Sequence, residues 1–522
     1  MTAASMEQTV LADGRVELSP EVDALLGDSR LHNEDLAPVP IAKRVWTTYN
    51  YIALWIGMAH NVATWTLAAG LIALGMAWYQ AILTIMIANI VVLIPMLANS
   101  HAGTKYGIPF PVFARASFGV IGANLPALVR AGVACGWFGI QTWIGGSAIF
   151  VLMGAIIGSS WTNAAHPSID FFGLSSQPWT MWLSFLVFWV LNIFIIVRGM
   201  NAIRHFENWA APFVLIVGIF LCIWMVSQAG GLGPILNDSG KLGWGSDFWV
   251  KTFPPALMAM IAFWSTLSLN MPDFTRFGRS QREQAVGQAV GLPTTMTLFP
   301  LIAVITTSAS QVVYGTAIWD PVALTGKFTN PLVVVFALFT LAVATLSVNV
   351  AANIVSPSYD FSNAWPKRIS FRTGGLITGV IGILIQPWNL YNDPHAYIFT
   401  WLNTYGGATG AIAGVLIADY WWIRRRRLHL AELYRRDGKY TYASGWNWIA
   451  VVSLLVGIVI AIGGSYTPAG TEGPFPQGGI IGFLKDPFPF ADYSWVVGLV
   501  VSFVLYGVLT KLVGNKAATK ED

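Results

Sequence analysis

The chain has too few charged residues to give a water-soluble fold a polar surface. Asp, Glu, Lys and Arg make up 10% of its 522 residues, whereas 55% are hydrophobic and 24 are Trp. Soluble domains carry about 25% charged residues. The composition therefore predicts a membrane protein, and not the three or four soluble domains that the length would allow at about 150 residues each.

Twelve apolar segments are long enough to cross a bilayer, since one helical span takes about 20 residues. They lie at roughly 50–74, 78–98, 123–156, 179–198, 206–228, 251–272, 290–315, 331–355, 374–391, 396–423, 445–463 and 493–514. The sequence thus predicts an all-α protein of twelve transmembrane helices, the third of which is expected to begin as an interfacial segment. Polar tails at 1–44 and 515–522 flank the spans, and the acid-rich first tail is expected to be mobile.

The basic residues predict the orientation of the chain. If it begins inside the cell, the outer segments hold only four of the 29 Lys and Arg residues, and the other 25 lie in inner segments. The four are Lys241, Lys251, Lys327 and Lys485. Cytoplasmic loops carry an excess of Lys and Arg, so this asymmetry predicts twelve spans in the cell membrane with both termini in the cytoplasm.

Several other classes of function find no support. The net charge of +4 does not indicate nucleic-acid binding, and Cys135 and Cys222 suffice neither for a disulfide framework nor for a metal cluster. There is no P-loop, HExxH or Asp-rich lipid-phosphate motif. Gly145 to Ala148 weakly resembles a serine nucleophile, but no His–Asp pair supports it. We expect that the protein is not an enzyme and that it uses no cofactor and no tightly bound metal. Its energy is expected to come from an ion gradient and not from ATP.

The first ten helices are compatible with two five-helix halves of opposite topology, because five is an odd number of crossings. The halves are residues 45–228 and 229–428, and residues 429–514 hold two further helices. The first helix of each half carries small or polar residues within its span, at Gly57 to Asn61 and at Trp264 to Thr266 and Asn270 to Pro272. Interrupted helices at matching positions indicate a transport site near the membrane midplane.

Polar side chains inside apolar spans mark candidate sites, because a polar group in hydrocarbon needs a partner or a water-filled cavity. The first group is Gly57, His60 and Asn61, where an opened helix would expose carbonyl groups to a cation. The alternative is that His60 and Asn61 only join helices by hydrogen bonds. The imidazole of His60 can also titrate near neutral pH.

A second group fits a flat polar ring. Trp137 and Gln141 are four residues apart on one helix face, so an indole can stack on the ring while the carboxamide binds its edge. Trp264 offers a second aromatic wall. Asp273 lies near the inner end of the same helix, where we expect only a salt bridge to Arg276 or to a neighbouring basic residue.

The segment 331–355 contains two carboxamides, Asn349 and Asn353, which share a face close to Ser347. Amides at mid-membrane depth can pair with the N–H and C=O groups of a base-like ring. These isolated polar clusters do not favour a channel, which needs a continuous polar stripe or a ring of like charges.

Long stretches of the chain resemble the nucleobase:cation symporter-1 family of purine, pyrimidine, hydantoin and allantoin permeases. The resemblance covers roughly residues 31–460, through LHNEDLAPVP…RVWTTYNYIALWIGMAHNVATW, NSHAGTKYGIPFPVFARASFG, WSTLSLNMPDFTRFGRSQ, NVAANIVSPSYDFSN and ADYWWIRRRRLHLAELYRRDGKYTYASGWNW. It implies a leucine-transporter-like fold, with two inverted five-helix repeats and two peripheral helices.

The resemblance also implies a substrate site. By analogy with the hydantoin permease of the family, two indoles sandwich the substrate ring, two carboxamides bind its edge, and two more amides lie nearby. These pairs are Trp137 and Trp264, Gln141 and Asn353, and Asn349 and Asn61. Phe263 stands where that permease has Gly, and its side chain is expected to resize the pocket.

A cation site is implied less completely. The carbonyl groups that bind sodium in the sodium-coupled relative correspond to Gly57, His60 and Ala344, and one of two hydroxyl groups is kept as Ser347. The other position is Val348, which offers no side-chain oxygen to a hard cation. The resemblance therefore favours proton coupling, with His60 as a candidate proton carrier, over sodium coupling.

The combined prediction is a secondary active importer that carries a planar heterocycle by alternating access, most closely an allantoin or uracil permease. The alternatives are a sodium-coupled hydantoin, cytosine or purine permease and, outside the family, a channel. The expected partners are the small heterocycle, co-transported H⁺ or Na⁺ and membrane lipid, around a protein that acts as a monomer.

Overall fold

The structure, a computed structural model, describes residues 8–27, 29–163, 166–170, 176–198, 215–237, 240–328, 330–390, 401–463 and 493–513. Seven helical segments in these residues are long and apolar enough to span a membrane. They are α5 (Trp78–Tyr106), α7 (Asn124–Ile157), α9 (Trp179–Arg198), α12 (Phe253–Asn270) with the π-helical turn Asp247–Thr252, α14 (Gln281–Tyr314), α16 (Pro331–Asn353) with α17 (Val355–Ala364), and α22 (Ser494–Val513). An eighth span is the bent pair α3 (Thr48–Ala59) and α4 (Val62–Ala73).

The remaining four predicted spans correspond to shorter helices. These are Leu215–Gln228, α18 (Phe371–Leu384), α20 (Asn403–Ile417) with the π-helical turn Ala418–Ile423, and α21 (Trp448–Ile462). The predicted spans over 206–228 and 396–423 are described only from residues 215 and 401, and the expected tail at 515–522 lies outside the described residues.

Short elements connect the spans. Strands β1 (Gln8–Val10) and β2 (Val16–Leu18) pair antiparallel, as do β3 (Ser168–Asp170) and β4 (Ser176–Pro178). The short helices are α2 (Pro20–Leu26), α6 (Phe110–Phe118), α8 (Ser159–Thr162), α11 (Leu232–Leu236), α13 (Pro272–Thr275), α15 (Pro321–Thr325) and α19 (Pro387–Leu390), with single 3₁₀ turns at Ile41–Lys43, Ala431–Tyr434 and Lys439–Thr441.

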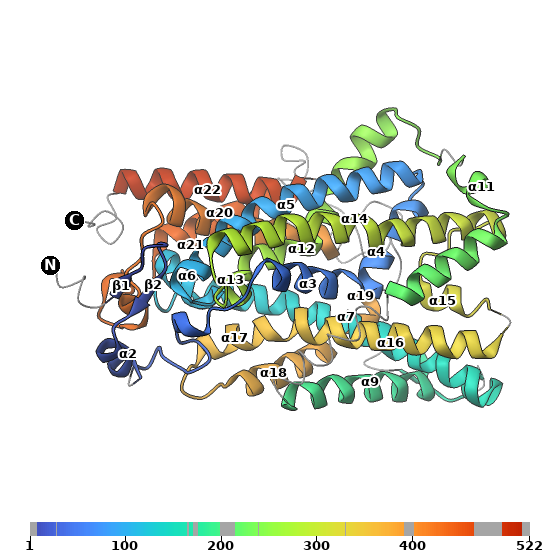
Figure 1. Ribbon diagram of the computed structural model, residues 1–522, viewed down its shortest axis with the longest axis horizontal. Coiled ribbons are helices and arrows are strands. Elements are labelled where there is room, and N and C mark those ends of the chain that lie inside the picture. Colours follow the sequence, from blue (N-terminus) through green and yellow to red (C-terminus); the bar gives the residue numbers. More distant parts are fainter. Residues whose placement is uncertain are drawn as a thin grey trace.

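Most spans form two packed groups that lie side by side along the long axis of the molecule, and α20, α21 and α22 pack mainly on one another (Figure 1). We call α3, α4, α5, α12 and α14 the bundle, and α7, α9, α16, α17 and α18 the scaffold. In Figure 1 the tail elements β1, β2 and α2 lie at the same end as the last turn of α22, whereas α11 and α15 lie at the opposite end. This placement agrees with an even number of crossings.

Two bundle helices are longer than their apolar runs predicted. α5 continues through polar residues to Tyr106 and ends where Gly107 adopts a left-handed conformation with φ of 71°. α14 begins at Gln281, directly after Ser280, whose Oγ accepts a hydrogen bond from the Glu283 backbone N–H at 3.2 Å. Hydropathy reports only the part of a helix that lies in lipid, so it misses polar turns beyond that part.

The predicted interruption of the first span is confirmed. α3 and α4 meet at an angle of 62°, with Gly57 in the last turn of α3 and His60 in a non-helical conformation. Asn61 closes the break, because its Oδ1 accepts a hydrogen bond from the Thr64 N–H at 2.9 Å and its Nδ2 donates to the Met58 carbonyl at 2.6 Å.

The matching interruption in the second half lies only at the end of its helix. α12 is continuous through Trp264 to Thr266 and ends at Asn270, before Pro272. The hydroxyl group of Ser265 donates to the Ala262 carbonyl at 2.8 Å within the same helix, so this polar residue is satisfied without opening the backbone. The third span also differs from expectation, since α7 is one continuous helix without a separate interfacial segment.

The N-terminal tail is folded onto the ends of the helices. Leu31 and Leu36 are buried, and the guanidinium of Arg115 in α6 donates to the Leu31 carbonyl at 3.0 Å. Burial lowers the pKa of Arg115 to about 10, so it stays protonated at neutral pH. The expectation of a mobile tail is therefore wrong for residues 8–27 and 29–44.

Arg276, just after α13, binds this tail. Its guanidinium donates to the carbonyl groups of Asp35 at 3.0 Å and Ala37 at 2.7 Å. Asp273 accepts a hydrogen bond from the Phe110 N–H at 2.8 Å. The expected Asp273–Arg276 salt bridge is replaced by these contacts, because the folded tail brings backbone carbonyl groups to the guanidinium.

Candidate substrate site

Three aromatic side chains meet where α7 of the scaffold faces α12 of the bundle. The ring of Phe263 lies edge-on to the indole of Trp137, at a centroid distance of 5.1 Å, and to that of Trp264, at 4.8 Å. All three side chains are buried. The structure thus brings the two predicted ring-stacking residues to one place, where Phe263 contacts both of them.

Tyr405 of α20 joins this aromatic group, and the sequence analysis missed it. Its hydroxyl group accepts a hydrogen bond from Trp137 Nε1 at 3.1 Å and donates one to the Ala262 carbonyl at 2.9 Å. One oxygen atom therefore links α7, α12 and α20. A phenol inside an apolar span was the available signal, because a buried tyrosine hydroxyl usually finds a partner.

Among the described residues, four buried polar atoms at the aromatic group lack a hydrogen-bond partner. Two are the indole N–H groups of Trp55, edge-on to Trp264, and of Trp401, edge-on to Tyr405. The other two are Gln141 Oε1, one turn beyond Trp137, and Trp264 Nε1. The two side chains are only 4% and 3% exposed. Because buried polar atoms are nearly always hydrogen-bonded, one free acceptor and one free donor here suit a ligand that carries both N–H and C=O groups.

The two asparagines of α16, Asn349 and Asn353, differ in their hydrogen-bond partners. Asn349 is fully buried, and its Nδ2 lies 3.3 Å from the Phe138 carbonyl, 3.2 Å from Thr142 Oγ1 and 3.2 Å from Asn192 Oδ1. Its Oδ1 accepts a hydrogen bond from Asn353 Nδ2 at 2.9 Å. The polar groups of Asn349 are therefore engaged within the scaffold, and Asn349 reaches a ligand only through Asn353.

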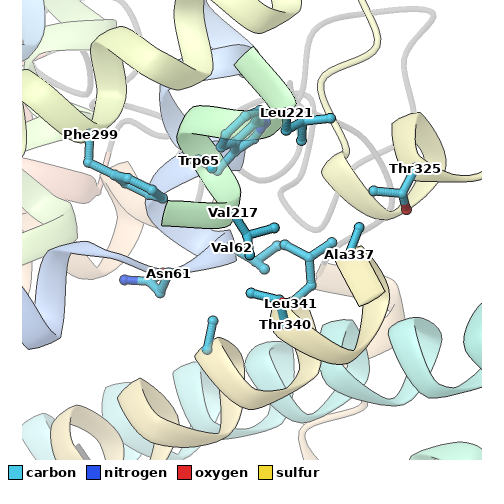
Figure 2. A pocket seen from close by; sticks show the side chains of 12 residues that line it. Asn61, Val62, Trp65, Val217, Leu221, Phe299, Thr325, Ala337, Thr340 and Leu341 are labelled. Atoms are coloured by element: carbon cyan, nitrogen blue, oxygen red, sulfur yellow. The ribbon is translucent and has the colours of Figure 1, made fainter. Parts of the chain in front are cut away.

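Asn61 and Ala344 line a small pocket between α4, α16 and the helix Leu215–Gln228. Figure 2 shows Val62, Val217 and Leu341 turned toward one another there, with the Asn61 amide at the edge of the group. Neither indole of the aromatic group lines this pocket. Asn61 therefore lines this pocket, and its part in substrate binding stays a prediction.

The other predicted cation-site residues lie on the broken span and on α16. The imidazole of His60 packs edge-on against Phe299 of α14 at 4.9 Å, and its Nδ1 is hydrogen-bonded to the Ile56 carbonyl. Its ring therefore lies within the bundle. Ser347 and Val348 are buried on α16. Within the described part of the chain, no three His, Cys, Asp or Glu side chains are grouped so that they could hold a metal ion.

Comparison with known proteins identifies the family. Residues 38–498 match the family model described as permease for cytosine/purines, uracil, thiamine and allantoin. The chain belongs to this family. The permease is 40% identical to the allantoin permease of Bacillus subtilis over 491 residues, which is 93% of this chain and 94% of that relative. It is 36% identical to the purine-uracil permease NCS1 of Arabidopsis thaliana over 494 residues, 94% of this chain and 80% of that one.

A solved structure supports the same assignment. Mhp1, a nucleobase-cation-symport-1 family transporter in a closed conformation with bromovinylhydantoin bound, superposes with a TM-score of 0.72 at 26% identity, covering 93% of the permease and 96% of Mhp1. The predicted family and the leucine-transporter-like architecture are therefore confirmed. The permease is a multi-pass membrane transporter of the nucleobase-symporter type and not an enzyme.

Proposed function

We propose that this permease imports a planar, amide-rich ring, allantoin or uracil, across the cell membrane, with both termini in the cytoplasm. The observation that carries the proposal is the pair of buried, unpartnered atoms, Gln141 Oε1 and Trp264 Nε1, at the aromatic group. Both heterocycles present alternating N–H and C=O groups on a flat ring, which complements an acceptor and a donor beside indoles. The names of the two relatives support the same class of substrate.

Each residue of the proposed site has a distinct role. Trp137 and Trp264 stack on the ring, Gln141 and Asn353 bind its edge, and Phe263 limits its size. Asn349 orients Asn353, and Asn61 stabilises the broken span beside the site by capping α4.

Alternating access follows from the origin of these side chains. Trp264 and Phe263 belong to the bundle, whereas Trp137 and Asn353 belong to the scaffold. A ligand that contacts both groups of helices favours the arrangement in which both contacts are made. Rocking of the bundle against the scaffold then exposes the bound ring to one side of the membrane at a time.

We infer that the coupling ion is H⁺. Val348 supplies no side-chain oxygen, and the pocket beside Ala344 is lined mostly by apolar side chains such as Val62 and Leu341. A sodium ion needs an all-oxygen shell, so this environment supports protons over sodium. His60, at the break between α3 and α4, is the proposed proton carrier.

A competition assay tests the proposed substrate class. Cells that express the permease take up labelled allantoin in the presence of an excess of unlabelled uracil, hydantoin, cytosine or an open-chain ureide. We expect the planar rings to compete and the open-chain ureide to leave uptake unchanged, because only a flat ring stacks on the indoles. Uptake that no ring reduces would contradict the proposal, and stronger competition by hydantoin under a sodium gradient would favour a sodium-coupled hydantoin permease.

A further inference from the structure

Three buried amides form a hydrogen-bonded chain through the scaffold. In α9, Asn192 Nδ2 donates to the Phe188 carbonyl at 2.9 Å, and its Oδ1 lies 3.2 Å from Asn349 Nδ2. Asn349 Oδ1 in turn accepts from Asn353 Nδ2 at 2.9 Å. Asn192 and Asn349 are fully buried and Asn353 is 6% exposed, so the chain leads from the interior of the scaffold to the proposed substrate site.

Backbone carbonyl groups fix which amide atoms donate and which accept in this hydrogen-bonded chain. The carbonyl oxygens of Phe188 and Phe138 can only accept hydrogen bonds, so Asn192 and Asn349 must turn their N–H groups toward them. The Thr142 hydroxyl donates to the Phe138 carbonyl at 2.6 Å and therefore offers its oxygen to Asn349. A reversed Asn349 amide would bring its oxygen against the oxygens of Phe138 and Asn192 and leave the Asn349 oxygen without a donor.

We propose that Asn349 and Asn192 are positioning residues that fix which polar groups Asn353 presents to the substrate, and that the permease thereby selects rings of the imide type. Asn349 offers Asn353 only an oxygen atom, so Asn353 uses one N–H on it. What remains for the ligand is the Asn353 carbonyl oxygen together with its second N–H. The inference rests on the proposed role of Asn353 in substrate binding and narrows the class of substrate.

The fixed order of acceptor and donor on Asn353 distinguishes rings of nearly equal shape. A carboxamide with its oxygen fixed in place pairs with a ring N–H next to a ring C=O, as in uracil, hydantoin and the ring of allantoin. 1-Methylcytosine, which has no ring N–H, presents the reverse, a ring nitrogen lone pair next to an amino group. Its lone pair would face the Asn353 oxygen, and a site built around one hydrogen-bond pattern strongly rejects a ligand that leaves its polar groups unpaired.

The test is the ratio of two inhibition constants for labelled allantoin uptake, that of 1-methylcytosine divided by that of the imide ring of matched shape, 1-methyluracil. In the unmodified permease we expect a ratio of about tenfold or more. In Asn349→Leu the Asn353 amide is free to rotate by half a turn, so the ratio should fall to about threefold or less. Asn192→Leu should lower it by a smaller factor, because Phe138 and Thr142 still hold Asn349.

The matched control is Ser184→Ala, which removes a buried hydroxyl of α9 that donates only within its own helix, to the Thr180 carbonyl at 2.8 Å. This variant should keep the ratio of the unmodified permease. A general packing defect would change uptake in all variants but would not change the ratio.

Three outcomes would overturn the inference. They are equal competition by 1-methylcytosine and 1-methyluracil in the unmodified permease, failure of 1-methyluracil to compete with allantoin, and an unchanged ratio in a folded Asn349→Leu. Should Asn349→Leu not fold, an unchanged ratio in Asn192→Leu overturns it. Absence of any heterocycle uptake by the unmodified permease refutes the proposed function itself, and this is seen before any variant is made.

Discussion

Two buried ion pairs in the permease differ in how completely they are hydrogen-bonded. Asp419, in the π-helical turn after α20, lies 2.7 Å from Arg424 Nε. Its carboxylate also accepts hydrogen bonds from Ser117 Oγ at 3.0 Å and from the Tyr506 hydroxyl at 2.6 Å. Arg424 donates in addition to the Ala116 carbonyl at 3.0 Å. The pair thus ties α6 and α22 to the end of α20.

The second pair, Arg130 of α7 and Asp360 of α17, is poorly bonded. Its closest atoms, Arg130 Nη1 and Asp360 Oδ2, are 3.5 Å apart. Among the described residues, none makes a hydrogen bond of good geometry with Arg130 Nε or Nη1, with either carboxylate oxygen of Asp360, or with one oxygen of nearby Asp273. Asp273 follows the bundle helix α12 and interacts electrostatically with both members of the pair. The weakly bonded charges therefore lie where scaffold and bundle meet.

The difference follows from the cost of burying charges. Desolvation of two ions is offset only by good geometry and by additional hydrogen bonds to their remaining polar atoms. Asp419 and Arg424 meet this requirement and hold together elements that need not move. Arg130 and Asp360 do not meet it, and their position at the boundary of two helix groups allows them to change partners when the bundle rocks.

The largest expected effect is on the well-bonded pair. Asp419→Ala leaves the Arg424 guanidinium buried without its counter-ion, which should lower the free energy of unfolding by about 3–5 kcal/mol. Thermal unfolding of the purified protein in detergent, followed by size-exclusion chromatography, measures the loss. Tyr506→Phe is the matched control, because it removes a single hydrogen bond and should cost about 1 kcal/mol. Equal losses of stability in the two variants would show that Asp419 does not have the proposed structural role.

Joint replacement of the poorly bonded pair should leave stability intact and affect transport. In Arg130→Met combined with Asp360→Leu, apolar side chains replace two badly compensated charges, so stability should be unchanged or higher by up to about 4 kcal/mol. Transport should nevertheless be lost, because the charges that act between scaffold and bundle are gone. Uptake and thermal unfolding are measured on the same preparation. A variant that unfolds, or that transports normally, would show that the two pairs do not differ as described.

The same contrast between satisfied and unsatisfied polar groups applies at the proposed substrate site. Trp137→Ala removes a stacking wall, and Asn353→Ala removes an edge contact. Each should lower the affinity for the heterocycle by about 5- to 150-fold while the protein stays folded and inserted, because base–aromatic stacking and a buried hydrogen bond are each worth about 1–3 kcal/mol. Competition binding on monodisperse protein checks this, with lipid-facing Val190→Ala as the control. A variant that keeps the affinity of the unmodified permease would exclude its residue from the site.

The smallest effect is expected at Tyr405. Tyr405→Phe leaves Trp137 Nε1 and the Ala262 carbonyl without their shared partner, so affinity for the substrate should fall by roughly five- to tenfold, in line with the loss of about one hydrogen bond. The apparent dissociation constant of the heterocycle measures this directly. An unchanged constant would mean that the hydroxyl group does not position Trp137.

Hydropathy and polar residues within spans predicted much of the architecture. They located the spans, and the small and polar residues from Gly57 to Asn61 marked the break between α3 and α4. They did not give the polar ends of α5 and α14, because helix continuation there depends on caps and packing against neighbouring helices. The folded N-terminal tail was missed for the same reason, since its partners lie far away in the sequence.

The candidate site was predictable in its residue types but not in its connections. Trp137 and Trp264 were found from their position in spans, and the structure brings both into contact with Phe263. The proposed orientation of the Asn353 amide depends on Asn349 and Asn192, which belong to different helices. Asn192 does carry a sequence signal, as a carboxamide in the apolar run WVLNIFIIV, but its partner is defined only by packing.

Accumulation of labelled allantoin in proteoliposomes tests the central claim most directly. The purified permease is reconstituted in sodium-free buffer, and a pH gradient, acid outside, is imposed. The account predicts accumulation above the external concentration, its collapse when a protonophore dissipates the gradient, and no response to a sodium gradient at fixed pH. Accumulation that follows the sodium gradient and ignores the pH gradient would contradict proton coupling, and absence of accumulation of both allantoin and uracil under either gradient would contradict the proposed function as a whole.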